Sequence, residues 1–185
     1  MGLKLIIGPA ADPVSVSEIK EYYRGIDGNE LDTTINNLIK AARHAAQDYQ
    51  NRAYFTQTWE LSFDGFPTMP VKIPLPPLQD LESVRYIDSN GTEYTMNIND
   101  FIVDKRSEPG RVAFKVGKSW PSVQLQPIDS VIFRFVAGHN DTSKIPHSVK
   151  LAYMLYVTYF LDHPDAEEPP KAFYTLLSAE RLVPV

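Results

Sequence analysis

The chain has 185 residues, a formal net charge of −5 from 18 Lys and Arg against 23 Asp and Glu, and no cysteine. The missing cysteines exclude disulfides, thiolate metal ligands and cysteine nucleophiles, and the acidic balance disfavours binding of nucleic acid by bulk charge. The length predicts a single domain, which at this size buries about 70% of its unfolded surface. The longest apolar run, Leu151 to Leu161, is far shorter than the ~20 residues that cross a bilayer, so we expect a soluble protein without membrane contact.

Two helices are predicted in the first third of the chain. Ser15 and Glu18 have the spacing of a capping box at the start of the first helix, which Gly25 ends. The second helix runs from about Glu30 to Gln50, with apolar residues at helical spacing and alanines in its second half. Because small side chains let a neighbouring helix approach closely, we expect this alanine face to pack on a helix.

From Thr56 the apolar pattern changes to a period of two, which predicts strands, first in TQTWELSFDGFP. The segment VKIPLPPL is proline-rich and suits an edge strand or a connection. Hairpins are predicted around Ser89-Asn90-Gly91 and around Pro109-Gly110. A strongly apolar strand, Ser130 to Gly138, closes this region.

The helical period returns near Pro146, in a helix that stops before Pro164. Its middle is apolar nearly all round, so it must be buried on several sides. A last short helix is predicted in AFYTLLSAERL. Helices, then strands, then helices predict an α+β fold: a helical bundle from about 15–51 and 145–182, with an inserted antiparallel β-rich region at about 56–138.

Gly117-Lys118-Ser119 matches the end of a phosphate-binding loop. The motif also requires a glycine at position 112, which is a valine here, and a helix after the loop, where Trp120-Pro121 follow instead. We interpret the segment as a Pro-Gly turn that leads into a half-buried strand. We expect this strand to point Val112, Phe114 and Val116 inward and Arg111 and Lys115 outward.

No pattern of catalytic or metal-binding residues is found. DSNGTEYTMNIND resembles a calcium loop, but its glycine stands at the fourth position rather than the sixth, so a hairpin turn explains it without metal. The four histidines form no ligand pair, and no GxSxG elbow is present. We therefore predict no catalytic residue, metal or cofactor. The alternative is a small enzyme or ligand-binding domain with a pocket between helices and sheet, in which His139, Asp141 and Tyr153 are the residues to suspect.

Two sets of residues are candidates for contact with a partner. The only basic concentration, Lys105 to Lys118, contains Glu108 as its one acidic residue, and is either a solvated strand face or a surface for an acidic partner or DNA backbone. Its candidate contacts are Arg111 and Lys115. We expect most aromatic residues of the C-terminal helices to form core, and the alternative for a part of them is that another subunit covers them. Candidates for that part are Tyr156, Tyr159, Phe160 and Phe173.

Several segments, which follow one another between Leu5 and about His163, together resemble a known protein family. The segments are PAADPVSVSEIKEYYR, TQTWELSFDGFP, IPLPPLQDLESVRYIDSNG, SEPGRVAFKVGKSWP and FVAGHND ahead of IPHSVKLAYMLYVTYFLDH. Together they are similar to the tailed-phage head–tail connector proteins, also called adaptor or head-completion proteins and associated with DNA packaging. The C-terminal part, from Pro164 on, matches less clearly.

The resemblance implies a structural virion protein and not an enzyme. Such proteins form a ring beneath the portal, twelvefold in the virion, which extends the DNA channel and provides the docking surface for the next head-completion or tail protein. The implied partners are further copies of this chain, the portal protein, that downstream protein, and DNA that passes without sequence-specific binding. The implied location is the head–tail junction, after synthesis in the bacterial host cytoplasm. A closed ring uses a head-to-tail contact, so each subunit needs two different interface faces.

Overall fold

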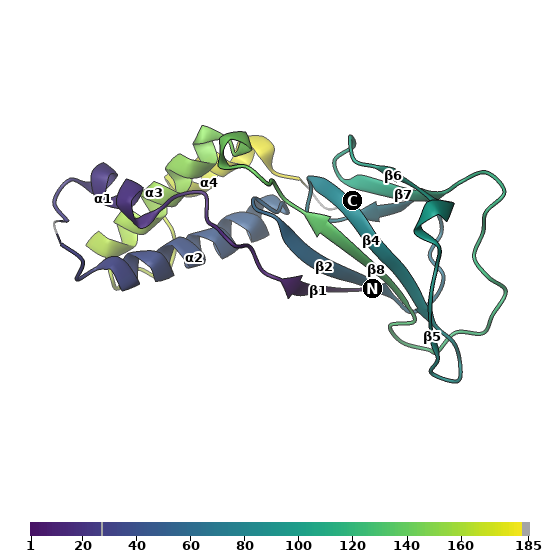
Figure 1. The fold of residues 1–185 in the computed structure, drawn as a ribbon. Helices are drawn as coiled ribbons and strands as arrows, with labels where there is room; N and C mark the ends of the chain where they lie inside the picture. Colours follow the sequence, from purple (N-terminus) through teal and green to yellow (C-terminus); the bar gives the residue numbers. More distant parts are fainter. Residues whose placement is uncertain (27, 183–185) are drawn as a thin grey trace. The chain divides into compact units, whose positions relative to one another are not determined.

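The computed structural model describes residues 1–26 and 28–182 (Figure 1). The elements in chain order are β1 (Gly2–Ile7), α1 (Val16–Tyr23), α2 (Asp32–Gln50), β2 (Gln57–Phe63), β3 (Val71–Ile73), β4 (Leu78–Ile87), β5 (Glu93–Thr95), η1 (Ile98–Asp100), β6 (Phe101–Asp104), β7 (Gly110–Phe114), β8 (Val131–Ala137), η2 (Thr142–Lys144), α3 (His147–Asp162), α4 (Lys171–Leu177) and η3 (Ser178–Glu180). Two compact units are formed, one by Met1–Pro9 with Thr56–Gly138 and one by Ala10–Phe55 with the described part of His139–Val185. The α+β prediction is confirmed, and the single domain stays a prediction.

The first unit consists of two antiparallel sheets. The larger has the strand order β1-β2-β8-β4-β5 and the smaller the order β3-β7-β6. The apolar strand β8 lies at the centre of the larger sheet, and its alternate residues from Val131 to Ala137 are buried. β3, from the proline-rich segment, lies at an edge of the smaller sheet, as predicted.

The two sheets are in contact through β4 and β7. Gly110 begins β7 and pairs with Ile73, and a Cβ placed on Gly110 would lie 2.7 Å from the Cβ of Leu78 in β4. Further along, Trp120 lies between Phe101 of the smaller sheet and Phe133 of the larger, at centroid distances of 6.3 and 6.2 Å. The apolar faces of the sheets therefore enclose a shared core.

Both predicted hairpins are present, but one turn differs from the prediction. β4 and β5 flank Ser89-Asn90-Gly91, where Gly91 has φ 82° and the Asp88 carboxylate accepts from the amides of Asn90 and Thr92. β6 and β7 form the other hairpin, but their connection is residues 105–109 and Gly110 is already a strand residue. Gly110 is thus explained by the close approach of Leu78, not by a turn conformation.

The inward orientation predicted for Val116 is wrong, because Val116 is fully exposed. β7 ends at Phe114, and the amide of Lys118 then donates to the carbonyl oxygen of Lys115 across a turn in which Gly117 has φ 79°. Val116 lies at the tip of this turn. Val112 is buried and Phe114 half-buried, as the alternation predicts. The strand β1 is not among the elements that the sequence patterns predict.

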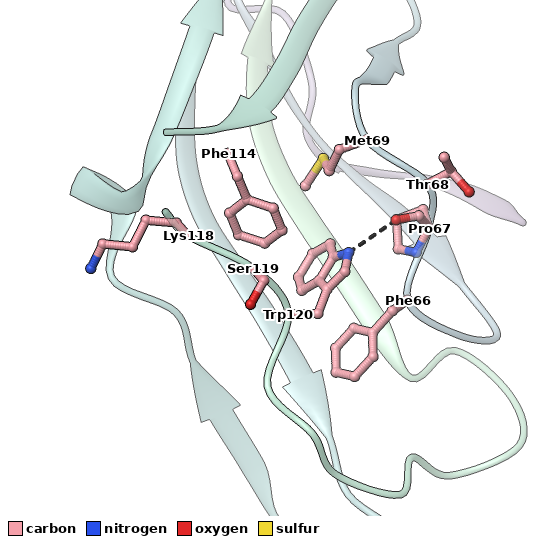
Figure 2. Close-up of a pocket in the computed structure, with 8 residues that line it drawn as sticks. All are labelled: Phe66, Pro67, Thr68, Met69, Phe114, Lys118, Ser119 and Trp120. Carbon is pink, nitrogen blue, oxygen red and sulfur yellow. Dashed lines mark hydrogen bonds between the residues drawn. The ribbon is translucent and has the colours of Figure 1, made fainter. Parts of the chain in front are cut away.

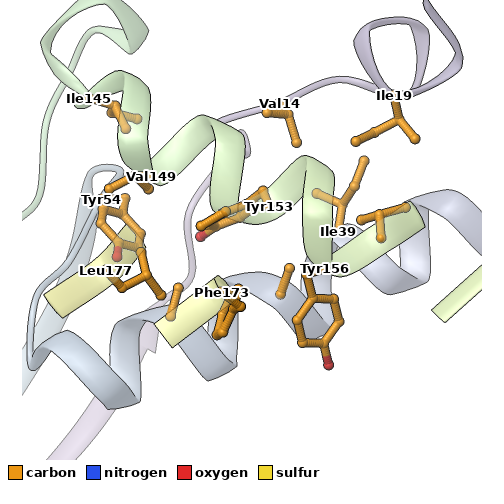
Figure 3. Close-up of a cluster of buried hydrophobic side chains, with 14 of the residues drawn as sticks. Val14, Ile19, Ile39, Tyr54, Ile145, Val149, Tyr153, Tyr156, Phe173 and Leu177 are labelled. Carbon is orange, nitrogen blue, oxygen red and sulfur yellow. The ribbon is translucent and has the colours of Figure 1, made fainter. Parts of the chain in front are cut away.

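The second unit is a helical bundle whose core includes residues from each of the described α-helices, α1 to α4 (Figure 3). Ile19 of α1, Ile39 of α2, Tyr153 of α3 and Phe173 of α4 are buried there and belong to the cluster of side chains that Figure 3 draws. Ala42 and Ala46 of α2 are completely buried, as expected for the alanine face. The helix α3 has its apolar middle buried on several sides, as predicted, with Leu151 on the exposed side.

The predicted capping box of α1 is confirmed. The Glu18 amide donates to Ser15 Oγ at 3.2 Å, and the Ser15 amide donates to Glu18 Oε2 at 2.7 Å. The helix ends at Arg24, which has the left-handed φ of 47°, one residue before the predicted Gly25. At the end of α2, the buried Gln50 side chain donates to the carbonyl of Leu177 and accepts from the Tyr54 hydroxyl, which ties α2 to α4.

Candidate interaction surfaces

The sheet unit contains a pocket of about 340 Å³ around Trp120 (Figure 2). Its lining residues are Phe66, Pro67, Thr68, Met69, Phe114, Lys118, Ser119 and Trp120. The indole Nε1 of Trp120 donates to the carbonyl of Pro67 at 3.0 Å. Phe66 stacks on the indole at a centroid distance of 4.8 Å, and Phe114 meets it edge-on at 4.9 Å. The pocket therefore offers aromatic faces to a partner, while its indole N–H is already bonded.

The pocket includes two residues of the stretch that resembles a phosphate loop. Lys118 and Ser119 lie on its wall, but they follow the turn at Gly117 and lead into extended chain. The Lys118 ammonium is 2.9 Å from the Asp100 carboxylate. No helix N-terminus follows these residues, so the interpretation as a turn and strand, not as a nucleotide loop, is supported.

The residues of the enzyme alternative do not line this pocket. Tyr153 is fully buried in the helical core, and burial raises the pKa of its hydroxyl well above the ordinary value. Asp141 caps η2, where the Ser143 hydroxyl and amide hold the pKa of the carboxyl below its ordinary value. His139 donates its backbone amide to the Tyr54 carbonyl. Among the described residues, no three His, Asp or Glu side chains are grouped to bind a metal.

Most of the positive charges between Lys105 and Lys118 are paired with carboxylates that lie outside this segment. Lys105 pairs with Asp80 at 2.8 Å, and Arg111 pairs with Asp104 at 2.7 Å. Donation from the Ser107 hydroxyl and then from the Arg111 guanidinium holds the pKa of Asp104 well below its ordinary value. Lys115 forms no ion pair with any described residue. Of the two predicted basic contacts, only Lys115 thus carries an uncompensated charge.

A charged network crosses the outer face of the larger sheet. The guanidinium of Arg85 on β4 contacts Glu60 on β2 and Glu93 on β5. Arg134 on β8 contacts Glu82 at 2.9 Å and approaches Glu60 at 3.8 Å. The period-two patterns predict an outward polar face, but pairs such as Glu60 and Arg134 meet only because of strand register. This network therefore was not predictable from local sequence.

The four aromatic candidates on the C-terminal helices differ in exposure. Phe173 is completely buried and Tyr156 nearly so. Tyr159 and Phe160 are half-buried, and Tyr159 stacks on His163 at a centroid distance of 4.6 Å. Phe173 thus has no surface to offer a partner, while Tyr159 and Phe160 stay predicted contacts. Within the described chain, no helix combines the length and apolar character that a membrane span requires.

Comparison with known proteins identifies one matching family. The family model described as "Head completion protein" matches residues 14–168, which include parts of both units. The match ends close to where the sequence resemblance weakens, near Pro164. No curated protein sequence matches the chain.

Three solved structures of gene transfer agent (GTA) particles contain chains similar in fold. One is the neck of an empty GTA particle computed with C6 symmetry, with TM-score 0.81 and 18% identity over 100% of this chain and 97% of that one. The virion of a native particle gives TM-score 0.78 at 18% identity, with the same coverage of 100% and 97%. The neck of a native particle computed with C12 symmetry gives 0.76 at 19% identity, again over 100% and 97%.

Proposed function

Because this chain belongs to the head completion protein family, we propose that it forms a ring at the head–tail junction of a phage-like particle. The family match over residues 14–168 is the observation that carries the proposal. Membership makes the chain a structural component of a head–tail junction. The same membership supports a structural rather than a catalytic role.

The proposed ring lies beneath the portal, surrounds the path of the DNA and provides the docking surface for the next protein of the junction. The similarity in fold to chains from GTA necks, computed with C6 and C12 symmetry, supports a cyclic arrangement, and we propose twelve copies in the particle. DNA passes through the ring without sequence-specific contact. The chain is made in the cytoplasm of the bacterial host and acts in the particle.

A deletion experiment tests this role. In a strain that lacks the gene, we expect DNA-filled heads without attached tails, and we expect purified full-length chain to bind those heads and restore tail attachment. Heads that also lack the portal are the matched control and should not bind the chain. Normal yields of complete particles from the deletion strain would contradict the proposal.

The predicted basic contact is tested within the same system. Reversal of both charges in R111E/K115E should reduce tail attachment, because the proposed contact is with a negatively charged partner or DNA backbone. Since Arg111 also pairs with Asp104, the single variant K115E is the cleaner test, and R111E serves as the control for loss of that pair. Unchanged particle yield with K115E would show that Lys115 is a solvent-exposed residue without a partner contact.

A further inference from the structure

The larger sheet has two strands that pair on one side only. β1 and β5 are its terminal strands within the described chain, and each has a single hydrogen-bonded neighbour. An edge strand of this kind presents unpaired N–H and C=O groups to any strand that can add to it. β1 is six residues long and mostly exposed, with Leu3 at 43% and Leu5 at 40%. Its only charge is Lys4, so it is poorly protected against pairing.

The direction of the strands permits a head-to-tail contact through these edges. Four successive antiparallel pairings separate β1 from β5, so the two strands run in the same direction. If a second copy continues the sheet, its β1 lies parallel to β5 of the first copy. Such a contact uses two different faces of one subunit, which is what a closed ring requires.

The side chains on the two edges are complementary on both faces of the sheet. On the outer face, Lys4 on β1 is opposite Glu60 and has no ion pair with any described residue, while Glu93 on β5 is 47% exposed. The outer face is therefore positive at its β1 edge, through Lys4, and negative at its β5 edge, through Glu93, while Glu60, Glu82, Arg134 and Arg85 pair with one another between them. A copy added at either edge would bring these opposite charges together.

On the inner face of the sheet, both edges carry apolar side chains that could contact each other. Leu5 is opposite Trp59, on the face that carries the buried core. Tyr94 is opposite Tyr86, whose ring it stacks on at 5.2 Å, and it is 44% exposed. In a parallel pairing that sets Glu93 beside Lys4, the next residues along the two strands are Tyr94 and Leu5.

We propose that β1 of one copy adds to β5 of the next copy in a parallel pairing, with Lys4 beside Glu93 and Leu5 beside Tyr94. The inference rests on the proposed ring and names the surface through which neighbouring copies in that ring meet. Backbone hydrogen bonds between the strands hold the contact, and the charges on the outer face set its register. The aromatic pocket and the turn at Val116 take no part in it.

Cysteine cross-linking tests the pairing directly, because the chain has no cysteine of its own. Lys4 and Glu93 lie on strands four spacings apart, about 19 Å at ~4.8 Å per spacing. A disulfide needs Cα atoms within about 7 Å, so none can form inside one copy of K4C/E93C. In oxidised particles assembled with this variant, we expect a ladder of linked copies on non-reducing gels. The single variants K4C and E93C, and the exposed pair K4C/R106C, are matched controls and should give no ladder.

Charge reversal provides a second measurement. K4E and E93K each put like charges at the contact, and we expect each variant alone to associate about fivefold more weakly per contact. Mixed in equal amounts, the two variants should recover association, since every contact in an alternating ring again joins opposite charges. Any loss of folding in E93K through repulsion of Arg85 would not be repaired by mixing.

The outcomes separate the two proposals. If the deletion strain makes complete particles, the head–tail role is wrong whatever the edge contact. A different outcome is that particles require the chain and contain K4C/E93C, as seen on reducing gels, while oxidation yields only unlinked copies. That result would show that the edge pairing is wrong, and the head–tail role would stand. Failure of the mixed charge variants to recover association would also overturn the pairing.

Discussion

The two units leave different groups available to a partner. In the helical unit the backbone hydrogen bonds of each helix are internal, and two large aromatic side chains, Tyr153 and Phe173, are fully buried. The sheet unit ends in two strands with one unpaired side each, and it carries a charged network across its outer face. Because a sheet cannot satisfy its own edges, the sheet unit is the more suitable one for repeated contact between copies.

The largest expected effect is in the helical core. Phe173→Ala should lower the free energy of unfolding by about 3–5 kcal/mol, because Phe173 of α4 is completely buried and its ring packs against Tyr156 of α3. Urea denaturation followed by circular dichroism measures the change. Tyr22→Ala, on an exposed part of α1, is the matched control and should cost far less. An equal cost for both variants would contradict the burial of Phe173.

Gly110→Ala should be the next most damaging change, and it affects the sheet unit. The added Cβ would lie 2.7 Å from Leu78 and 3.1 Å from the Asp104 carbonyl, so the sheets must separate, at a cost of about 1–3 kcal/mol. Gly65→Ala is the control, since a Cβ there meets nothing within 4 Å.

If the chain is the single domain that its length predicts, Phe173→Ala and Gly110→Ala shift the same unfolding transition. Two transitions, each moved by only one variant, would show that the units unfold separately.

A smaller effect is expected at the start of α1. Ser15→Ala removes the side-chain acceptor for the Glu18 amide and should cost about 1 kcal/mol in thermal or urea unfolding. Ser15→Asp keeps an acceptor oxygen at the cap and is expected to retain most of the stability. Equal losses in the two variants would show that the cap contributes through something other than that acceptor.

The smallest effect concerns Asp104, whose side chain is partly exposed. Its pKa is lowered in the folded chain by Ser107 and Arg111, so ionised Asp104 contributes stability at neutral pH. This contribution is present above the ordinary pKa of about 3.9 and is lost as the pH falls through the lower folded value. The difference in urea midpoint between the wild type and Asp104→Asn should therefore shrink from pH 7 toward acid. A difference independent of pH would contradict the lowered pKa.

Local patterns were enough to predict most of the elements. The Ser15 and Glu18 spacing gave the capping box, and the Asn90-Gly91 pair gave a hairpin, because both depend on backbone groups only a few residues apart. The prediction for Val116 is wrong because the alternation does not extend to it: the amide of Lys118 donates to the carbonyl of Lys115 across a turn in which Gly117 has φ 79°. The strand β1 was missed because six residues acquire a strand conformation only through pairing with β2.

The sequence alone determined the α+β order, the apolar character of β8 and α3, the absence of a complete nucleotide motif, and the likeness to a head-completion family. Tertiary structure decided which charges are compensated: Asp80 and Lys105 are far apart in sequence and meet only through the packing of strands. It also decided which strands became edges, since β1 and β5 are terminal only in the order β1-β2-β8-β4-β5. Short-range patterns depend on backbone geometry within a few residues, whereas pairing partners depend on how the whole sheet closes over its core.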